Sequence, residues 1–517
     1  MWKAIIVAAA LTALMLLSQV GLAIHHQLSS KELHHIFGVK RKYDVPQYSV
    51  IHHIHSNDEI PASVKSDKSS NPSVAVFRQK PNASATEAPE YLYEFSHANV
   101  SYRFHVTPVL PENLLSPGFH AVERNQNHSR LLTTSSSFFP HGLGRKTCLF
   151  SGKSISHDYH SNDSNAWMSM VGCGHKVRVL IGLPSTGEHI IIQPLHSKAL
   201  ITAAGNKINS NTVQSSNSST TTATTSINGG HPHVIYKRSV GGSHRIKRQR
   251  FHTVDSPFIV ESDNETKCLY DIRDDPYRNI RDDPIPLDDD GDNENHNKSA
   301  KFERLAVVRG PVVVELGVFV DDAMWQHFDD IYGSEADSEL LNFILAAVNN
   351  IHLLFTHRSL KPPVNIVITR YEVLKHPPVD ISKETHSRGN VDLLLENFCD
   401  YQHRINPKSD GNMRHWDHGI LFSGYDLYRG KLKSVAGYAP VKGMCSGSRS
   451  CTINEGLDFG AVFVITHEMG HSLGMVHDGD NGCNRNINIM SPSVGAGKTS
   501  WSRCSNKEYN VFVSQLG

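Results

Sequence analysis

The sequence lacks an excess of charge of either sign. Lys and Arg together number 51, as do Asp and Glu, so the formal net charge of the 517-residue chain is zero. Because no net field favours polyanions, we expect no nucleic-acid partner. Internal repeats are also absent, and beyond the N-terminus no apolar run is long enough for a bilayer, so we expect no transmembrane segment.

The one conspicuous apolar run stands at the N-terminus. Lys3 precedes apolar residues 4–17, and the small residues Gly21 and Ala23 follow. This order is typical of a secretory signal peptide, and we expect residues 1–23 to be removed. The alternative is a membrane anchor, for which the run is short, since a span needs about 20 residues. We therefore expect a secreted protein of the extracellular space or matrix.

Cysteine is scarce, with eight residues, but all of them follow the signal peptide. In an oxidising compartment most should pair. The glycosylation sequons Asn-x-Ser/Thr fit secretion and lie only before residue 300, which predicts a glycosylated N-terminal half. They occur at Asn82, Asn99, Asn127, Asn162, Asn217, Asn264 and Asn297.

Residues 24–250 are interpreted as a propeptide. Alternating segments such as 91–106, and the apolar segment 189–194, predict strands, so we expect this region to be mostly β. Asn, Ser and Thr dominate residues 205–230, a composition that cannot bury enough apolar surface to order itself.

A basic cluster at residues 245–250 follows that tract. Arg245, Lys247 and Arg248 form the Arg-x-Lys-Arg pattern that furin-type processing proteases cleave. The alternative is a solvated basic patch, but the position after a signal peptide and a flexible tract favours processing. Acidic and Pro-containing residues 251–310 are expected to form an extended linker.

Residues 311–517 are predicted to form an α/β domain. Strand-like apolar segments alternate with segments of helical spacing. The expected strands are 311–321, 364–371 and 419–423, and the expected helices are 336–357 and 391–404.

One segment of this domain carries a candidate metal site. His467 and His471 are four residues apart, so they project from one helix face and can reach one ion. Gly474 ends the helix and allows a turn that brings His477 to the same ion. Three protein ligands leave a position for water, which indicates a catalytic Zn²⁺ site. Glu468, next to the first ligand, would be the general base for zinc-activated water.

A bare His-Glu-x-x-His pattern also occurs by chance on surface helices. The longer string His-Glu-x-x-His-x-x-Gly-x-x-His, with Met490 downstream, makes chance a poor explanation and is a metzincin signature. Met490 is expected to form a hydrophobic floor below the metal, and Asp478 to anchor the turn. We expect substrate to add as an extended strand along residues 434–441.

At these residues the chain resembles the reprolysin (adamalysin-type) metzincins, and within them the ADAMTS proteases. The resemblance covers about two-thirds of the chain and implies a mixed twisted sheet with long helices, an active-site helix and a Met-turn, preceded by a mostly β prodomain. It also implies hydrolysis of extracellular or matrix proteins. The matching stretches are 93–106, 173–195, 397–407, 415–423, 450–478 and 489–505.

The resemblance further implies bonds and ligands. It pairs Cys399 with Cys451, Cys483 with Cys504, and Cys148 with Cys173. Glu315 and Asp417 resemble positions that bind a structural Ca²⁺. A prodomain cysteine often keeps the zinc latent in this family. The only candidate here, Cys268, follows Arg248, so either latency is arranged differently or the mature N-terminus comes later, for example at residues 278–281.

The family pairing leaves Cys445 alone among five cysteines after residue 300. The resemblance places its partner, and further calcium ligands, beyond Gly517, so we expect the domain to be incomplete and poorly secreted or weakly active. The alternative function is a catalytically weak form that binds or competes for partners. A zinc-sequestering His-rich protein is a weaker alternative, because the other His clusters lack ligand spacing.

Overall fold

The structure is a computed structural model, and it describes parts of the chain on either side of residues 240–311, together with residues 267–269. The signal peptide, the 205–230 tract, the 245–250 cluster, Cys148, Cys173, all seven sequons and nearly all of the acidic linker lie outside the described residues. The described residues are 24–55, 74–79, 90–98, 100–110, 113–125, 128–134, 149–155, 165–172, 176–196, 231–239, 267–269, 312–433, 435–493 and 498–516.

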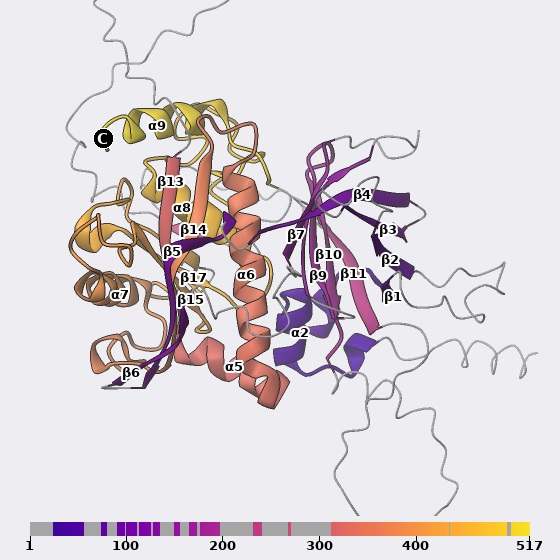
Figure 1. Cartoon of the computed structure of the whole chain (residues 1–517), viewed down its shortest axis with the longest axis horizontal. Coiled ribbons are helices and arrows are strands. Elements are labelled where there is room, and N and C mark those ends of the chain that lie inside the picture. The colour runs from indigo at the N-terminus through magenta and orange to yellow at the C-terminus, as the bar shows by residue number, and fades with distance from the viewer. Residues whose placement is uncertain are drawn as a thin grey trace, which may run out of the picture.

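The N-terminal half forms a closed β-barrel beside the helix α2 (Ser30–Phe37) (Figure 1). Its described strands follow the order β1-β11-β10-β9-β8-β7-β4-β3-β2. Closure leaves none of these strands with a free edge. The bounds are β1 (Tyr48–His55), β2 (Val74–Gln79), β3 (Tyr91–His97), β4 (Val100–Pro108), β7 (Leu149–Ser154), β8 (Trp167–Val171), β9 (Arg178–Leu183), β10 (Glu188–Pro194) and β11 (His231–Ser239).

Strands β9 and β10 are apolar on both faces because they serve two cores. Alternate residues such as Ile181 and Ile190 point into the barrel core, whereas Leu180 and Ile191 join the core shared with the C-terminal half. A strand with both faces covered reads as a continuous apolar run, which is the pattern of residues 190–192.

The C-terminal half is built on a mixed sheet in the order β12-β16-β17-β15-β13-β14-β5-β6. Strands β17, β15, β13 and β14 are parallel, and β16 is antiparallel to β17. The bounds are β12 (Lys267–Leu269), β13 (Val312–Val320), β14 (Val364–His376), β15 (His418–Ser423), β16 (Val435–Tyr438), β17 (Cys451–Glu455), α5 (Asp322–Tyr332), α6 (Ala336–Phe355), α7 (Val391–Ile405), α8 (Ala461–Ser472) and α9 (Arg503–Val513).

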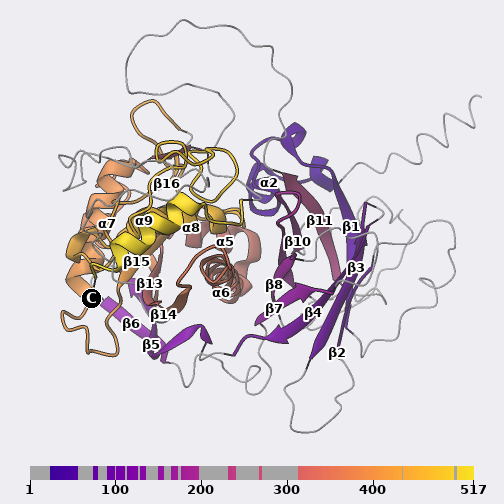
Figure 2. The same ribbon diagram turned by 90° about the horizontal axis from the view of Figure 1, so that it is seen from above.

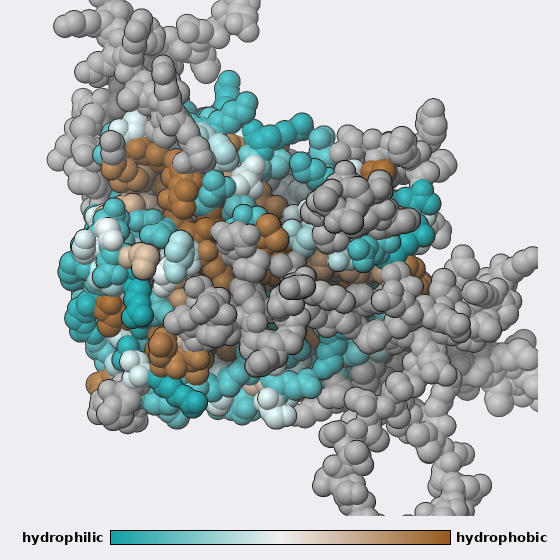
Figure 3. All heavy atoms as spheres, in the orientation of Figure 1, coloured by the Kyte–Doolittle hydropathy of each residue, from teal (hydrophilic) through white to brown (hydrophobic). Residues whose placement is uncertain are grey.

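Helix α6 stands between the barrel and this sheet (Figures 1 and 2). Its Asn349 side chain donates to Ser169 Oγ of β8 at 2.8 Å. The apolar span 322–355 is long enough to cross a membrane, but 72% of its most apolar window is buried inside the protein, which fits a core helix. In the space-filling view, apolar side chains gather where Figure 1 shows β13 (Figure 3). Val313 of this strand is exposed.

Two strands of the N-terminal half leave the barrel and extend the C-terminal sheet. β5 (Leu115–Asn125) pairs parallel with β14, and β6 (His128–Thr134) pairs antiparallel with β5 (Figure 2). The expected strands and helices of residues 311–517 are all present, but β14 is longer than expected, and α5, α9 and β17 were not anticipated.

Two disulfides within the C-terminal half confirm the expected pairing. Cys399 of α7 bonds Cys451 of β17, and Cys483 bonds Cys504 at the start of α9. Cys445 is free and exposed. Desolvation of its thiol, together with the carboxylates of Asp417 and Asp410, raises its pKa to about 12.

We expect alkylation of the intact, unreduced protein to label Cys445 and not the four disulfide cysteines. Because the thiolate is the nucleophile, the rate should rise about tenfold per pH unit at pH values below the pKa. Peptide mass spectrometry locates the label, and Cys445→Ser is the control. Complete protection of Cys445 after denaturation without reductant would mean that it is disulfide-bonded.

Asp321 begins α5 and is a buried carboxylate. Its Oδ1 accepts hydrogen bonds from the backbone of Met324 at 2.8 Å and Gly424 at 2.9 Å. Burial raises its pKa to about 7, so folding favours the protonated carboxyl.

We expect Asp321→Asn to remove a pH dependence of stability. The stabilising effect of protonated Asp321 is fully present below its unfolded pKa of about 4 and is lost as the pH rises through its folded pKa. The free energy of unfolding of the native protein, relative to the variant, should fall by up to about 1.4 kcal/mol per pH unit in this window. Urea titrations test this, with the exposed Asp400→Asn as control. An equal difference across the whole window would contradict the assignment.

Candidate active site

The candidate site is built on α8, whose twelve residues are all buried. Strands β16 and β17 pack on one side of α8 and α6 on another. The helix ends before Gly474, which has φ +88°. A Cβ at Gly474 would lie 2.7 Å from Phe512 Cβ of α9, so both the backbone conformation and the close packing favour glycine.

This arrangement brings the three predicted histidines together. His467 Nε2 lies 3.0 Å from His471 Nε2, and His477 Nε2 lies 3.2 Å from each of the other two. All three residues are buried. The turn at Gly474 carries His477 back over the helix end, as the spacing of the string predicted.

Backbone carbonyls orient two of the rings. His467 Nδ1 lies 2.7 Å from the carbonyl oxygen of Ile489, and His471 Nδ1 lies 2.8 Å from that of Met475. Such contacts place the proton on Nδ1 and leave the Nε2 lone pair at the centre. Burial lowers the pKa of all three histidines, that of His471 to about 4, so the imidazoles are neutral.

These features fit a bound zinc ion. Zinc–nitrogen bonds of about 2.0–2.1 Å in a tetrahedron place the nitrogens about 3.3 Å apart, close to the observed separations. Neutral imidazoles with inward lone pairs are the donors that zinc binds. Three such ligands leave one position for water or substrate.

Glu468 follows His467 in α8 and is fully buried. A Cβ at Gly437 of β16 would lie 2.9 Å from Glu468 Oε1 and 2.8 Å from Val464 Cγ1, so the backbone of β16 lies directly against this carboxylate. Sequence reasoning missed this contact, although a glycine in a strand often marks a close approach.

Met490 and Asp478 lie next to the histidine centre, at the end of α8 and in the turn that carries His477. Met490 is fully buried, and a Cβ at Gly470 of α8 would lie 2.5 Å from its Sδ. The backbone of Asp478 donates to the Met490 carbonyl at 2.7 Å, and its side chain accepts from Ser502 Oγ at 2.6 Å. These hydrogen bonds of Asp478 anchor the His477 turn, whereas the role of Met490 below the metal stays a prediction.

The two candidate calcium residues also lie together. The backbone N–H of Glu315 donates to Asp417 Oδ2 at 2.9 Å, and burial raises the pKa of both carboxyls. Asp417 further groups with Asp410 and His415, whose ligand atoms all lie within 4.8 Å of one another. Sequence reasoning missed these two residues because only the folded 406–417 loop brings them close.

The candidate latency cysteine lies on the edge of the same sheet. β12 pairs parallel with β16, and Cys268 is in register with Gly437. The backbone of Cys268 therefore runs beside the strand that touches Glu468. Among the described strands, β12 occupies the edge of β16 that was expected to receive substrate.

The sequence is similar to those of known proteins. Residues 313–517 match the Reprolysin (M12B) family of zinc metalloproteases. The chain is 30% identical over 507 residues to A disintegrin and metalloproteinase with thrombospondin motifs adt-1 of Caenorhabditis elegans, covering 96% of this chain and 29% of that protein. It is 36% identical over 207 residues to A disintegrin and metalloproteinase with thrombospondin motifs 16 of Mus musculus, covering 39% and 16%.

A third relative is A disintegrin and metalloproteinase with thrombospondin motifs 6 of Homo sapiens, 30% identical over 308 residues, which cover 56% of this chain and 25% of that protein. The chain thus spans less than a third of the length of these relatives. From the family match to the catalytic region and the similarity along nearly the whole sequence, we conclude that the chain belongs to the reprolysin family of zinc metalloproteases and is of the ADAMTS type.

Proposed function

We propose that the chain is the precursor of a secreted zinc metalloendopeptidase that hydrolyses extracellular or matrix proteins. The observation that carries this proposal is the convergence of His467, His471 and His477 Nε2 atoms beside a buried carboxylate. The extended relationship to proteases of the ADAMTS type supports it.

The three histidines and Glu468 have different roles in the proposed reaction. A zinc ion held by the three imidazoles would supply a Lewis acid that polarises the scissile carbonyl and acidifies a water. Glu468 accepts the proton of the attacking water on a carboxylate oxygen and delivers it to the leaving amine. Its burial against Gly437 confines that carboxylate to the edge of the centre.

Substrate binds as an added strand along β16. The backbone of this strand touches Glu468 at Gly437, so a peptide paired with β16 passes the reacting groups. The pairing of β12 with the same edge supports this geometry, because it shows that the edge accepts a strand.

Latency follows from the same pairing. In the precursor β12 fills the edge, and Cys268 is the thiol that we assign to latency. A cut after Arg248, at the Arg245-Lys247-Arg248 pattern, leaves β12 attached to the catalytic half. Full activity then requires β12 to leave β16 or a later cut, for which residues 278–281 are the candidate. Calcium at Glu315 and Asp417 would stabilise the fold.

We expect Glu468→Gln to retain zinc and the native fold but to lose peptide hydrolysis by several orders of magnitude, since the general base and its action on water are removed together. Turnover of a fluorogenic peptide, with and without a chelator, and metal analysis of the purified protein measure this. Glu396→Gln, on the exposed face of α7, is the matched control. Substantial turnover by metal-loaded Glu468→Gln would contradict the proposed role.

We expect Cys268→Ser to raise the activity of the uncut precursor at least tenfold. The substitution is made together with Arg248→Ala, so that processing does not obscure the result. Removal of the thiolate leaves only the pairing of β12 to block the edge. Peptide turnover by the secreted precursor is the measurement, and Cys445→Ser is the control. Equal activity with and without Cys268 would mean that latency does not depend on this thiol.

A further inference from the structure

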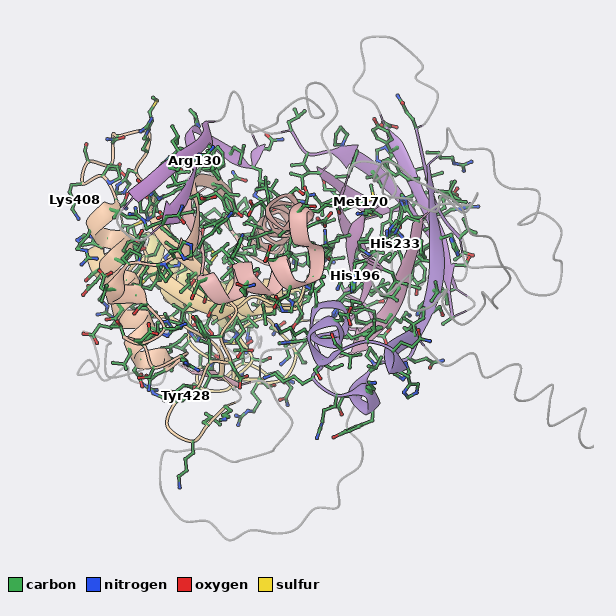
Figure 4. The ribbon with its side chains drawn as sticks, turned by 90° about the horizontal axis from the view of Figure 1, so that it is seen from below. Arg130, Met170, His196, His233, Lys408 and Tyr428 are labelled. Atoms are coloured by element: carbon green, nitrogen blue, oxygen red, sulfur yellow. A yellow bond between two sulfur atoms is a disulfide. The ribbon has the colours of Figure 1, made fainter. Side chains whose placement is uncertain are left out.

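The edge of β14 is paired with a β-hairpin from the N-terminal half. In this chain β5 and β6 fill it, although both strands precede the expected processing site by more than a hundred residues. Figures 1 and 2 show the hairpin outside the barrel and alongside β14, and Figure 4 places Arg130 of β6 on the catalytic side, far from Met170 and His233 of the barrel.

Side chains reinforce the backbone pairing at this edge. Arg124 Nε of β5 lies 2.5 Å from Glu372 Oε1 of β14, and Glu372 is fully buried. Arg370 Nη1 lies 2.8 Å from His120 Nε2. Lys375 Nζ lies 3.1 Å from Glu123 Oε2. These are buried or partly buried charge contacts between two parts of the chain that processing would separate.

Glu372 has further partners within the catalytic half. Arg370 Nε donates to its Oε2 at 2.7 Å, and Tyr401 OH donates to its Oε1 at 2.8 Å. The carboxylate therefore stays paired when the hairpin is absent, and the edge is preformed to receive Arg124.

The closest approach is at Gly118 of β5. A Cβ at this position would lie 1.5 Å from the carbonyl oxygen of Met413, in the 406–417 loop of the catalytic half. Backbone cannot move aside as a flexible side chain can. The hairpin is therefore fitted to this loop as well as to β14.

We propose that the propeptide, once cut from the catalytic half, remains its non-covalent partner through insertion of β5–β6 at the β14 edge. This surface lies at the opposite edge of the sheet from β16 and its metal centre. The inference rests on the proposed processing only because that cut separates the propeptide from the catalytic half. The docking itself needs neither zinc nor Glu468.

The test uses the full chain with residues 245–250 replaced by the site of an added sequence-specific protease. After complete cutting, the two fragments should co-elute on gel filtration at about micromolar concentration, as expected of a specific interface. The dissociation rate of the catalytic fragment from an immobilised propeptide fragment is then measured.

Gly118→Ala should accelerate dissociation at least tenfold, because the new Cβ overlaps the Met413 carbonyl. Gly411→Ala is the matched control. Gly411 lies in the same loop as Met413, and its Cβ would meet only Ser409 Oγ at 3.8 Å. Arg124→Met should also accelerate dissociation, and it provides the test if Gly118→Ala does not fold. Its control is Arg103→Met, which alters an exposed ion pair with Glu94 between the barrel strands β3 and β4.

A zinc chelator should leave the dissociation rate unchanged, which separates this docking from any hold at the metal centre. Separation of the unsubstituted fragments at micromolar concentration would overturn the proposal. So would dissociation of the Gly118 and Arg124 variants at the rate of their controls, because the barrel face against α5 and α6 would then be the anchor.

Discussion

Complete burial of α8 is the constraint on which the metal centre depends. A buried imidazole cannot gain a proton cheaply, so the three rings stay neutral. The carbonyls of Ile489 and Met475 take the Nδ1 side of two rings and turn the Nε2 lone pairs inward. Three unprotonated nitrogens within 3.2 Å of one another repel unless a cation lies between them. The packing that buries α8 therefore selects a metal-binding state.

The sequence predicted the centre because its geometry is local. Four-residue spacing on a helix and a glycine turn determine how His467, His471 and His477 converge. The regular spacing of apolar residues likewise predicted β13, α6, α7 and β15 from the sequence. Helix α9 was missed because its sequence is polar, with few apolar residues to show a period. The contacts of Gly437 with Glu468, and of Asp410 with Asp417, depend on loops and strands that meet only in the folded chain.

The pairing of β5 with β14 was the least predictable feature, since Arg124 and Glu372 are 248 residues apart. An alternating strand pattern reports burial of one face but not the identity of the neighbouring strand. The propeptide was therefore expected as a separate mostly β unit. The structure instead divides it between a closed barrel and a hairpin that belongs to the catalytic sheet.

The two ends of that sheet present the same physical problem, because an unpaired strand edge invites pairing with another chain. At β16, where we propose that substrate pairs, the occupant β12 is short and pairs irregularly. At β14 no catalytic group requires access, and the occupant is an eleven-residue strand with buried ion pairs and a glycine fitted against Met413. The weakly held edge suits the proposed release of β12 for substrate. The strongly held edge suits the proposed retention of the β5–β6 hairpin, so in the proposed precursor inhibition and attachment depend on different edges of the sheet.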